Sequence, residues 1–166
     1  MDVSDVFKKR NFKNVNFKYE NLIGKNLSDS FLSGVDLNGA DIHGADFSGA
    51  DLSNVKLKGG ILFQAKFRGA DLRGADLSDA KIWDADMYGV DMRGADLRGA
   101  DLFNTDLKSS DLSDADLSGS YLKNNNFTGA ILENTEFSNT KYDKKTIDTI
   151  TDKNSKLRLK NQGVFW

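Results

Sequence analysis

An apolar residue returns at every fifth position through most of this 166-residue chain. The register runs without insertion or deletion from Phe12 to Phe137 and holds 26 consecutive apolar centres. A β-strand alternates its side chains between two faces, so an odd period of five would turn every second centre outward. Five residues of α-helix advance by about 500°, which also scatters the centres. The chain must therefore bend once per repeat so that all centres face one axis.

The other four positions of the repeat agree with a chain that bends. Two residues before a centre the side chain is usually small, as in Ala70 and Ala95, and the residue between them is mostly Asp. Two residues after a centre stands Gly or Asn, which tolerate the positive φ of a tight corner. The unit is inward, outward, inward, and then a two-residue corner. Repetition of such a unit predicts a parallel β-solenoid, and the absence of proline fits a ladder of N–H donors.

Two stretches carry a family resemblance: Ala70-Asp71-Leu72-Arg73-Gly74 and Ala95-Asp96-Leu97-Arg98-Gly99. These repeats resemble the pentapeptide-repeat protein family, and the resemblance extends from Asn11 to about Tyr142. It implies an all-β fold, a right-handed quadrilateral parallel β-helix, with four repeats or 20 residues in each coil. It does not assign a function by itself.

The repeat boundaries divide the chain into three parts. We expect an N-terminal cap over residues 1–10, the β-helix over 11–142, and a C-terminal cap over 143–166. Asp143 is a good N-cap for a helix over roughly 144–151, and the remainder is a polar, basic tail that closes on Val164, Phe165 and Trp166. Solenoids need covered ends. Dimerisation through the C-terminal end, which the family resemblance also implies, stays open as an alternative.

Polar side chains occupy a few inward small-residue positions near the two ends of the repeat region. Arg10, Glu20 and Lys25 do so in the first coil, where we expect a wider coil whose side chains reach the open end. Asn125 does so near the other end, and its amide needs a hydrogen-bond partner if it is buried.

Composition excludes several classes of protein. Residues 11–142 carry 20 acidic and 14 basic side chains, whereas nucleic-acid binding requires a basic stripe, so direct binding of nucleic acid is disfavoured. The chain has no Cys and so no thiolate metal site, and we expect no metal or other cofactor. No apolar run approaches the roughly 20 residues of a membrane span. No signal-peptide pattern is visible in residues 1–10, so a cytoplasmic location is the default expectation.

If one coil holds 20 residues, one corner column is unlike the other three, because it is aromatic where they hold mainly Ser, Lys and Arg. The candidate partner-binding residues are Ile23, His43, Phe63, Trp83 and Phe103 of this column, Ile61 on the same face, and Tyr88, the only aromatic residue in the other three corner columns. Tyr121 lies on the same face as Ile61. The alternative is that the stacked rings only shield the corner backbone.

The outward acids form two further columns: Asp51, Asp71, Asp91 and Asp111, then Asp76, Asp96 and Asp116. Carboxylates about 4.8 Å apart repel, so solvent and neighbouring cations must relieve them. One interpretation, which the family resemblance implies, is a DNA mimic that modulates DNA gyrase or topoisomerase. A ladder of divalent cations is a second interpretation, and a solvated acidic face is the third.

An enzyme is disfavoured because His43 is the only histidine and outward residues on a convex rod do not converge on a pocket. The sequence therefore predicts a non-enzymatic scaffold that binds an unidentified protein partner. It predicts either a monomer or a homodimer formed through the C-terminal end.

Overall fold

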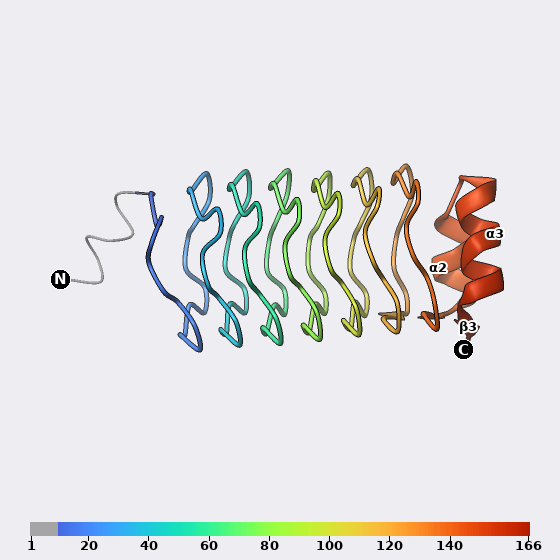
Figure 1. Cartoon of the computed structure of the whole chain (residues 1–166), viewed down its shortest axis with the longest axis horizontal. Coiled ribbons are helices and arrows are strands. Elements are labelled where there is room, and N and C mark those ends of the chain that lie inside the picture. The colour runs from blue at the N-terminus through green and yellow to red at the C-terminus, as the bar shows by residue number, and fades with distance from the viewer. Residues whose placement is uncertain (1–9) are drawn as a thin grey trace.

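The computed structural model describes residues 10–166, which form a right-handed quadrilateral parallel β-helix (Figure 1). Single-residue parallel β-bridges join each outward residue to the one 20 positions later, from Asn11 with Phe31 to Asp116 with Glu136. The predicted coil of 20 residues is therefore confirmed. We expected an N-terminal cap over residues 1–10. Residues 1–9 lie outside the described part of the chain, so this prediction stays untested.

Each corner is a β-turn with a positive φ at its third residue, as in a type II turn. That residue lies two positions after the apolar centre, and its φ is positive in all 26 repeats from Asn14 to Asn139. In most repeats the N–H of the following residue closes the turn on the carbonyl of the centre, as Ala75 does on Leu72 at 3.0 Å. Gly, Asn or Asp holds most of these positions because other residues pay a steric cost there.

Four of the five N–H groups of an interior repeat donate to backbone carbonyls. The outward residue donates to the previous coil, the centre and the third turn residue donate to the next coil, and the last N–H closes the turn. In the repeat centred on Leu72 these bonds join Asp71 to Ala50, Leu72 to Asp91, Gly74 to Arg93, and Ala75 to Leu72. One donor per repeat, on the second residue of the turn, has no backbone acceptor.

The outward Asp or Asn supplies the missing acceptor. Its side-chain oxygen accepts the N–H of the residue two positions later, in 18 repeats from Asn11 to Asn126. This is the Asx-turn pattern. The preference for Asp and Asn at the outward position therefore has a structural cause, since an unpaired backbone donor is costly.

The core is a set of columns of Leu, Ile, Met and Phe beside columns of small residues. Every apolar centre from Phe12 to Phe137 is buried, and the most exposed of them, Phe17, is 7% exposed. Phe47 and Phe67, one coil apart, stack with ring centroids 5.3 Å apart and planes within 5°. Equivalent side chains thus meet directly above one another, as the 20-residue coil requires.

Five short elements end the chain, and they are β1 (Tyr121–Leu122), β2 (Lys141–Tyr142), α2 (Lys144–Thr149), α3 (Lys153–Gln162) and β3 (Val164–Phe165). The three strands form one parallel sheet in the order β1-β2-β3. Helix α2 follows its predicted N-cap, Asp143, and ends two residues before the expected limit. Helix α3 occupies a stretch that the sequence suggested was a polar tail.

Helices α2 and α3 cover the C-terminal end of the core (Figure 1). Ile147, Ile150 and Leu159 are buried there. The hydroxyl groups of Thr146 and Ser155 each donate to a carbonyl of the last coil at 3.0 Å. Helix α3 was missed because it buries only Ser155 and Leu159, so its sequence shows no apolar stripe.

The same region accepts backbone donors of the last coil, which has no further coil to pair with. Asp143 accepts the N–H of Asn124 at 3.1 Å, and the Thr149 hydroxyl accepts the N–H of Phe127 at 2.9 Å. The backbone carbonyl of Gln162 accepts a third N–H, from Asn139. Two side chains and one backbone carbonyl of this segment therefore supply hydrogen-bond acceptors that a further coil would otherwise provide.

The polar residues at inward positions behave differently at the two ends of the rod. Arg10, Glu20 and Lys25 are exposed. Asn125 is fully buried, and its Nδ2 donates to the carbonyl of Leu102. Its Oδ1 has no hydrogen-bond partner among residues 10–166.

Candidate functional site

One corner of the rod carries a column of side chains that we call the aromatic corner: Ile23, His43, Phe63, Trp83, Phe103 and Lys123. Phe63 and Trp83 stack with ring centroids 4.7 Å apart and planes within 15°. His43 meets Phe63 edge-on at 6.0 Å. Trp83 is 38% exposed and Phe103 is 40% exposed. His43, Phe63 and Trp83 thus form a run of contacting rings, and solvent reaches Trp83 and Phe103.

The turn itself does not require aromatic side chains. Another corner has the same geometry with small or charged residues, because Ser33, Ser53, Arg73 and Arg93 stand at equivalent positions. Ser33 and Ser53 there share a hydrogen bond between their hydroxyl groups at 2.8 Å. The turn therefore forms without aromatic side chains, and those of the aromatic corner are not required by the fold.

Two further rings lie beside the aromatic corner, Trp166 from the end of the chain and Tyr121 from strand β1. Strand β3 pairs with β2, and the N–H of Trp166 donates to the carbonyl of Tyr142 at 2.9 Å, which places the C-terminal residue beside the corner. The Lys123 ammonium lies 4.5 Å from the centroid of the Trp166 ring. Tyr121 belongs to the neighbouring face, and the Lys141 ammonium lies 4.4 Å from its ring centroid.

These groups enclose a hollow of about 340 Å³, which we call the aromatic hollow. Its lining residues are Trp83, Asp84, Asp101, Phe103, Tyr121, Lys123 and Trp166. The repeat pattern does not predict that Trp166 takes part, because only the pairing of β3 with β2 brings it there. Asp84 and Asp101 were missed because they stand at ordinary turn and outward positions of the repeat.

The other predicted contact residues lie outside the aromatic hollow. Ile23 and His43 belong to the corner but stand in earlier coils, and Ile61 is half-buried on the neighbouring face. Tyr88 lies at a different corner, where the Arg68 guanidinium carbon is 4.7 Å from its ring centroid. The structure thus gathers Trp83 and Phe103 in one site, and Tyr88 lies at another corner, as the 20-residue register predicts.

The predicted acidic columns are built from turn-forming carboxylates. Each accepts the N–H of the residue two positions later, and they are Asp51, Asp71, Asp91, Asp111, Asp76, Asp96 and Asp116. Their regular spacing follows from the turn, so it is not by itself a sign of a ligand.

Arginines neutralise part of these columns. Arg73 donates from Nε to Asp71 at 2.8 Å and from a terminal nitrogen at 2.6 Å, and its Nε lies 3.7 Å from Asp91 in the next coil. Arg93 and Arg98 repeat the arrangement. Hydrogen bonds from the arginines lower the pKa of Asp71, Asp91 and Asp96 below the usual value. The columns therefore differ from the unbroken negative charge of a DNA backbone.

Neither a metal centre nor a catalytic cluster is visible in the described residues. No group of three or more His, Asp or Glu side chains within 10–166 is placed to hold a metal ion. His43 packs against Phe63 in the aromatic corner. Neither α2 nor α3 has the length and hydrophobicity that would let it traverse a bilayer.

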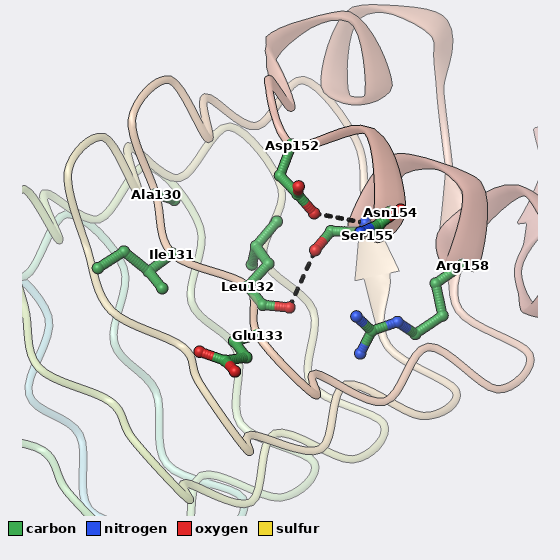
Figure 2. Close-up of a pocket in the computed structure, with 8 residues that line it drawn as sticks. All are labelled: Ala130, Ile131, Leu132, Glu133, Asp152, Asn154, Ser155 and Arg158. Atoms are coloured by element: carbon green, nitrogen blue, oxygen red, sulfur yellow. Dashed lines mark hydrogen bonds between the residues drawn. The ribbon is translucent and has the colours of Figure 1, made fainter.

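A second hollow, of about 450 Å³, lies where helix α3 meets the last coil (Figure 2). Three of the polar residues that line it form hydrogen bonds that start helix α3 or join it to the last coil. Asp152 accepts the N–H of Ser155 at 2.6 Å, and the Ser155 hydroxyl donates to the carbonyl of Leu132. Arg158 donates to the carbonyl of Thr135 at 3.2 Å. These bonds serve the attachment of α3.

Comparison with known proteins gives a consistent result. A family model described as "Pentapeptide repeats" matches residues 21–59, 61–102 and 100–139, with eight copies. No curated protein matches the chain significantly.

Solved structures with the same fold come from several sources. HetL, a pentapeptide repeat protein involved in heterocyst differentiation regulation in the cyanobacterium Nostoc sp. strain PCC 7120, is 25% identical, with 86% of this chain and 80% of HetL covered and a TM-score of 0.42. Trypsin-treated QnrB1, a plasmid-mediated fluoroquinolone resistance protein, is 23% identical, with 77% and 69% covered and a TM-score of 0.51. A pentapeptide repeat protein from the Arabidopsis thaliana thylakoid lumen is 33% identical, with 63% and 69% covered and a TM-score of 0.40.

The likeness to QnrB1 is one of fold, whereas the family model matches the repeats themselves over most of the chain. This protein belongs to the pentapeptide repeat family.

Proposed function

We propose that this protein is a non-enzymatic scaffold that binds a partner protein through the aromatic corner. The observation that carries the proposal is the stack of Phe63 on Trp83, with Trp83 and Phe103 exposed, at a turn that other corners build from Ser or Arg. Exposed aromatic side chains gathered on one surface are typical of protein contacts. The non-enzymatic part rests on the convex surface, where titratable groups of residues 10–166 do not converge around His43.

The experiment uses the full chain as bait in an extract of the source cells. The test variant is Trp83→Ser with Phe103→Ser, and the matched control is Lys108→Ser, at the same turn position of another corner where Ser48 already stands. A protein retained by wild type and by the control, and lost from the double variant, supports the proposal. Equal retention by all three contradicts it. Loss of the folded circular dichroism signal in the double variant would also contradict it, because the rings would then be structural.

Salt dependence tests whether the contact is aromatic. Retention through an aromatic surface should persist from about 50 mM to about 500 mM salt, whereas a contact made mainly by charges weakens steeply over that range.

The second candidate function is modulation of DNA gyrase or topoisomerase by charge mimicry through the two acidic columns. Seven carboxylates in two columns favour this candidate, because successive members of each column lie one coil apart. QnrB1 also shares the fold. The ion pairs of Arg73, Arg93 and Arg98 weigh against it. A gyrase supercoiling assay decides, because unchanged supercoiling at micromolar protein eliminates this candidate.

A further inference from the structure

The aromatic hollow combines ring walls with charged groups of both signs. The rings are Trp83, Phe103, Tyr121 and Trp166, and the charged groups are Asp84, Asp101 and Lys123. The residues that line the hollow carry two carboxylates and one ammonium, so the lining itself has one net negative charge. A positively charged group is therefore its electrostatic complement.

Each carboxylate keeps one oxygen available. Asp101 accepts the N–H of Phe103 through Oδ1 at 3.2 Å, and Asp84 accepts from Asn104 through Oδ1 at 2.6 Å. Within residues 10–166, neither carboxylate forms an ion pair and neither Oδ2 has a hydrogen-bond partner. Both negative charges are thus uncompensated by direct contact in that part of the chain.

The rings around the hollow already bind cations of the chain itself. The ammonium groups of Lys123 and Lys141 lie over Trp166 and Tyr121. The electron-rich face of an aromatic ring attracts such groups. Trp83 has Phe63 on one face, and among the described residues no cation lies over the ring of Trp83 or Phe103. Of the four rings that line the hollow, Trp83 and Phe103 are thus the two without a cation over them in the described part of the chain.

We propose that the aromatic hollow binds the side chain of a lysine or arginine of a partner protein, with the cation against Trp83 and Phe103 and close to Asp84 and Asp101. The inference rests on the proposed function, since it names the chemistry by which a partner engages the aromatic corner. The shared chemistry is a cation at the end of an aliphatic chain, because the ring walls accommodate the methylene groups.

The hollow contains its own reporter, because both tryptophans of the chain line it. Tryptophan fluorescence of the full chain is titrated with acetyl-Gly-Arg-Gly-amide and with acetyl-Gly-Lys-Gly-amide. The comparison peptides carry Glu or Leu at the central position. We expect a saturable change with at least one cationic peptide. Binding should weaken only modestly as salt rises from about 50 mM to about 500 mM, because salt screens the carboxylates while the contact with the rings persists. No saturable change with either cationic peptide, or equal binding of the Glu or Leu peptide, overturns the inference.

Asp84→Asn and Asp101→Asn remove the charges and keep the turns. Asn104 holds the same left-handed position one coil after Asp84, and Asn21 caps the same turn four coils before Asp101. We expect each substitution to weaken binding of the cationic peptide by about two- to fivefold, as for a partly exposed charge pair. The matched control is Asp114→Asn, at the equivalent position of another corner, which should leave binding unchanged. Equal binding by wild type and both Asn variants overturns the charge assignment.

Lys123→Gln gives a result of the opposite sign. Removing this ammonium relieves repulsion and frees the Trp166 ring, so binding of the cationic peptide should strengthen. Weaker binding by this variant would mean that the hollow prefers an anion and would overturn the inference.

The peptide titrations test the cation inference, and the extract experiment tests the proposed function, so a negative result in one does not decide the other. Partner loss from the Trp83→Ser and Phe103→Ser variant, without peptide binding, keeps the proposed function and removes the cation inference. Peptide binding without any partner that depends on the aromatic corner removes the proposed function.

Discussion

Asp71 and Arg73 are joined by three hydrogen bonds, one from the backbone N–H of Arg73 and two from its guanidinium. One carboxylate therefore closes a turn and holds a cation, and the same Arg73 reaches towards Asp91 in the next coil. The outward acids of this protein are in the first place parts of its turns. Their role as a surface comes second.

The turn role predicts unequal effects of two substitutions at Asp106. Its Oδ1 accepts the N–H of Lys108, and Asn126 makes the same bond in the next coil. Asp106→Asn should leave the free energy of unfolding nearly unchanged, whereas Asp106→Ala should lower it by about 1 kcal/mol because the donor loses its acceptor. Urea unfolding of the two variants measures the difference. Equal destabilisation by Asn and Ala would show that the side-chain bond contributes little.

The arginine pairs predict acid sensitivity. The hydrogen bonds of Arg73, Arg93 and Arg98 lower the pKa of their partner carboxylates below the ordinary value of 3.8. The unfolded chain then binds protons first as pH falls, so this stabilisation is complete above about pH 4 and is lost below it.

Urea unfolding at about pH 7 and about pH 3 compares wild type with a triple variant, Arg73→Gln, Arg93→Gln and Arg98→Gln. The variant should lose less stability between the two pH values, because its carboxylates have pKa values closer to those of the unfolded chain. An equal loss of unfolding free energy in wild type and in the triple variant would show that the arginine pairs do not cause the acid sensitivity.

Asn125 offers a stabilising substitution. Its buried Oδ1 has no partner among residues 10–166, and one coil earlier Thr105 fills the equivalent position with its hydroxyl donating to the carbonyl of Ile82. Asn125→Thr should raise the free energy of unfolding by about 1 kcal/mol, because it removes an unpaired buried acceptor and keeps a donor. Thermal unfolding provides the measurement. A lower melting temperature would indicate that the amide has a role that a hydroxyl cannot fill.

The covered C-terminal end predicts a monomer. Ile147, Ile150 and Leu159 are buried without a second chain, so the core needs no partner there. Light scattering should give a mass near the 18.4 kDa of one chain, and deletion of residues 164–166 should not change the oligomeric state. A dimer that dissociates on deletion would instead establish association through the exposed Val164 and Phe165.

Residues 143–166 also supply a test of the end of the rod. Thr146 accepts the N–H of Asn125 and donates to the carbonyl of Leu122, so one hydroxyl serves two buried groups of the last coil. Thr146→Val keeps the shape and removes both bonds, and it should cost about 1–3 kcal/mol. Thr151→Val is the exposed control. Equal stability of the two variants would mean that the coil end is satisfied in another way.

The amino-acid sequence by itself determined the corners and the core of this protein, and the family resemblance supplied the 20-residue length of the coil. An odd apolar period leaves a chain no regular strand or helix that buries every centre, so Leu72 and its equivalents must face one axis. The identity of each corner column followed from the 20-residue coil, which is why Phe63, Trp83 and Phe103 were correctly placed together.

Tertiary structure alone decided the contents of the aromatic hollow and the form of the C-terminal segment. Trp166 reaches Lys123 only because β3 adds to the sheet, and α3 forms because Leu159 and Ser155 contact the last coil. These contacts join residues with no common period, and a repeat pattern carries no information about them. The turn role of the outward Asp was also invisible in the pattern, since it depends on which backbone donor the neighbouring coils leave unpaired.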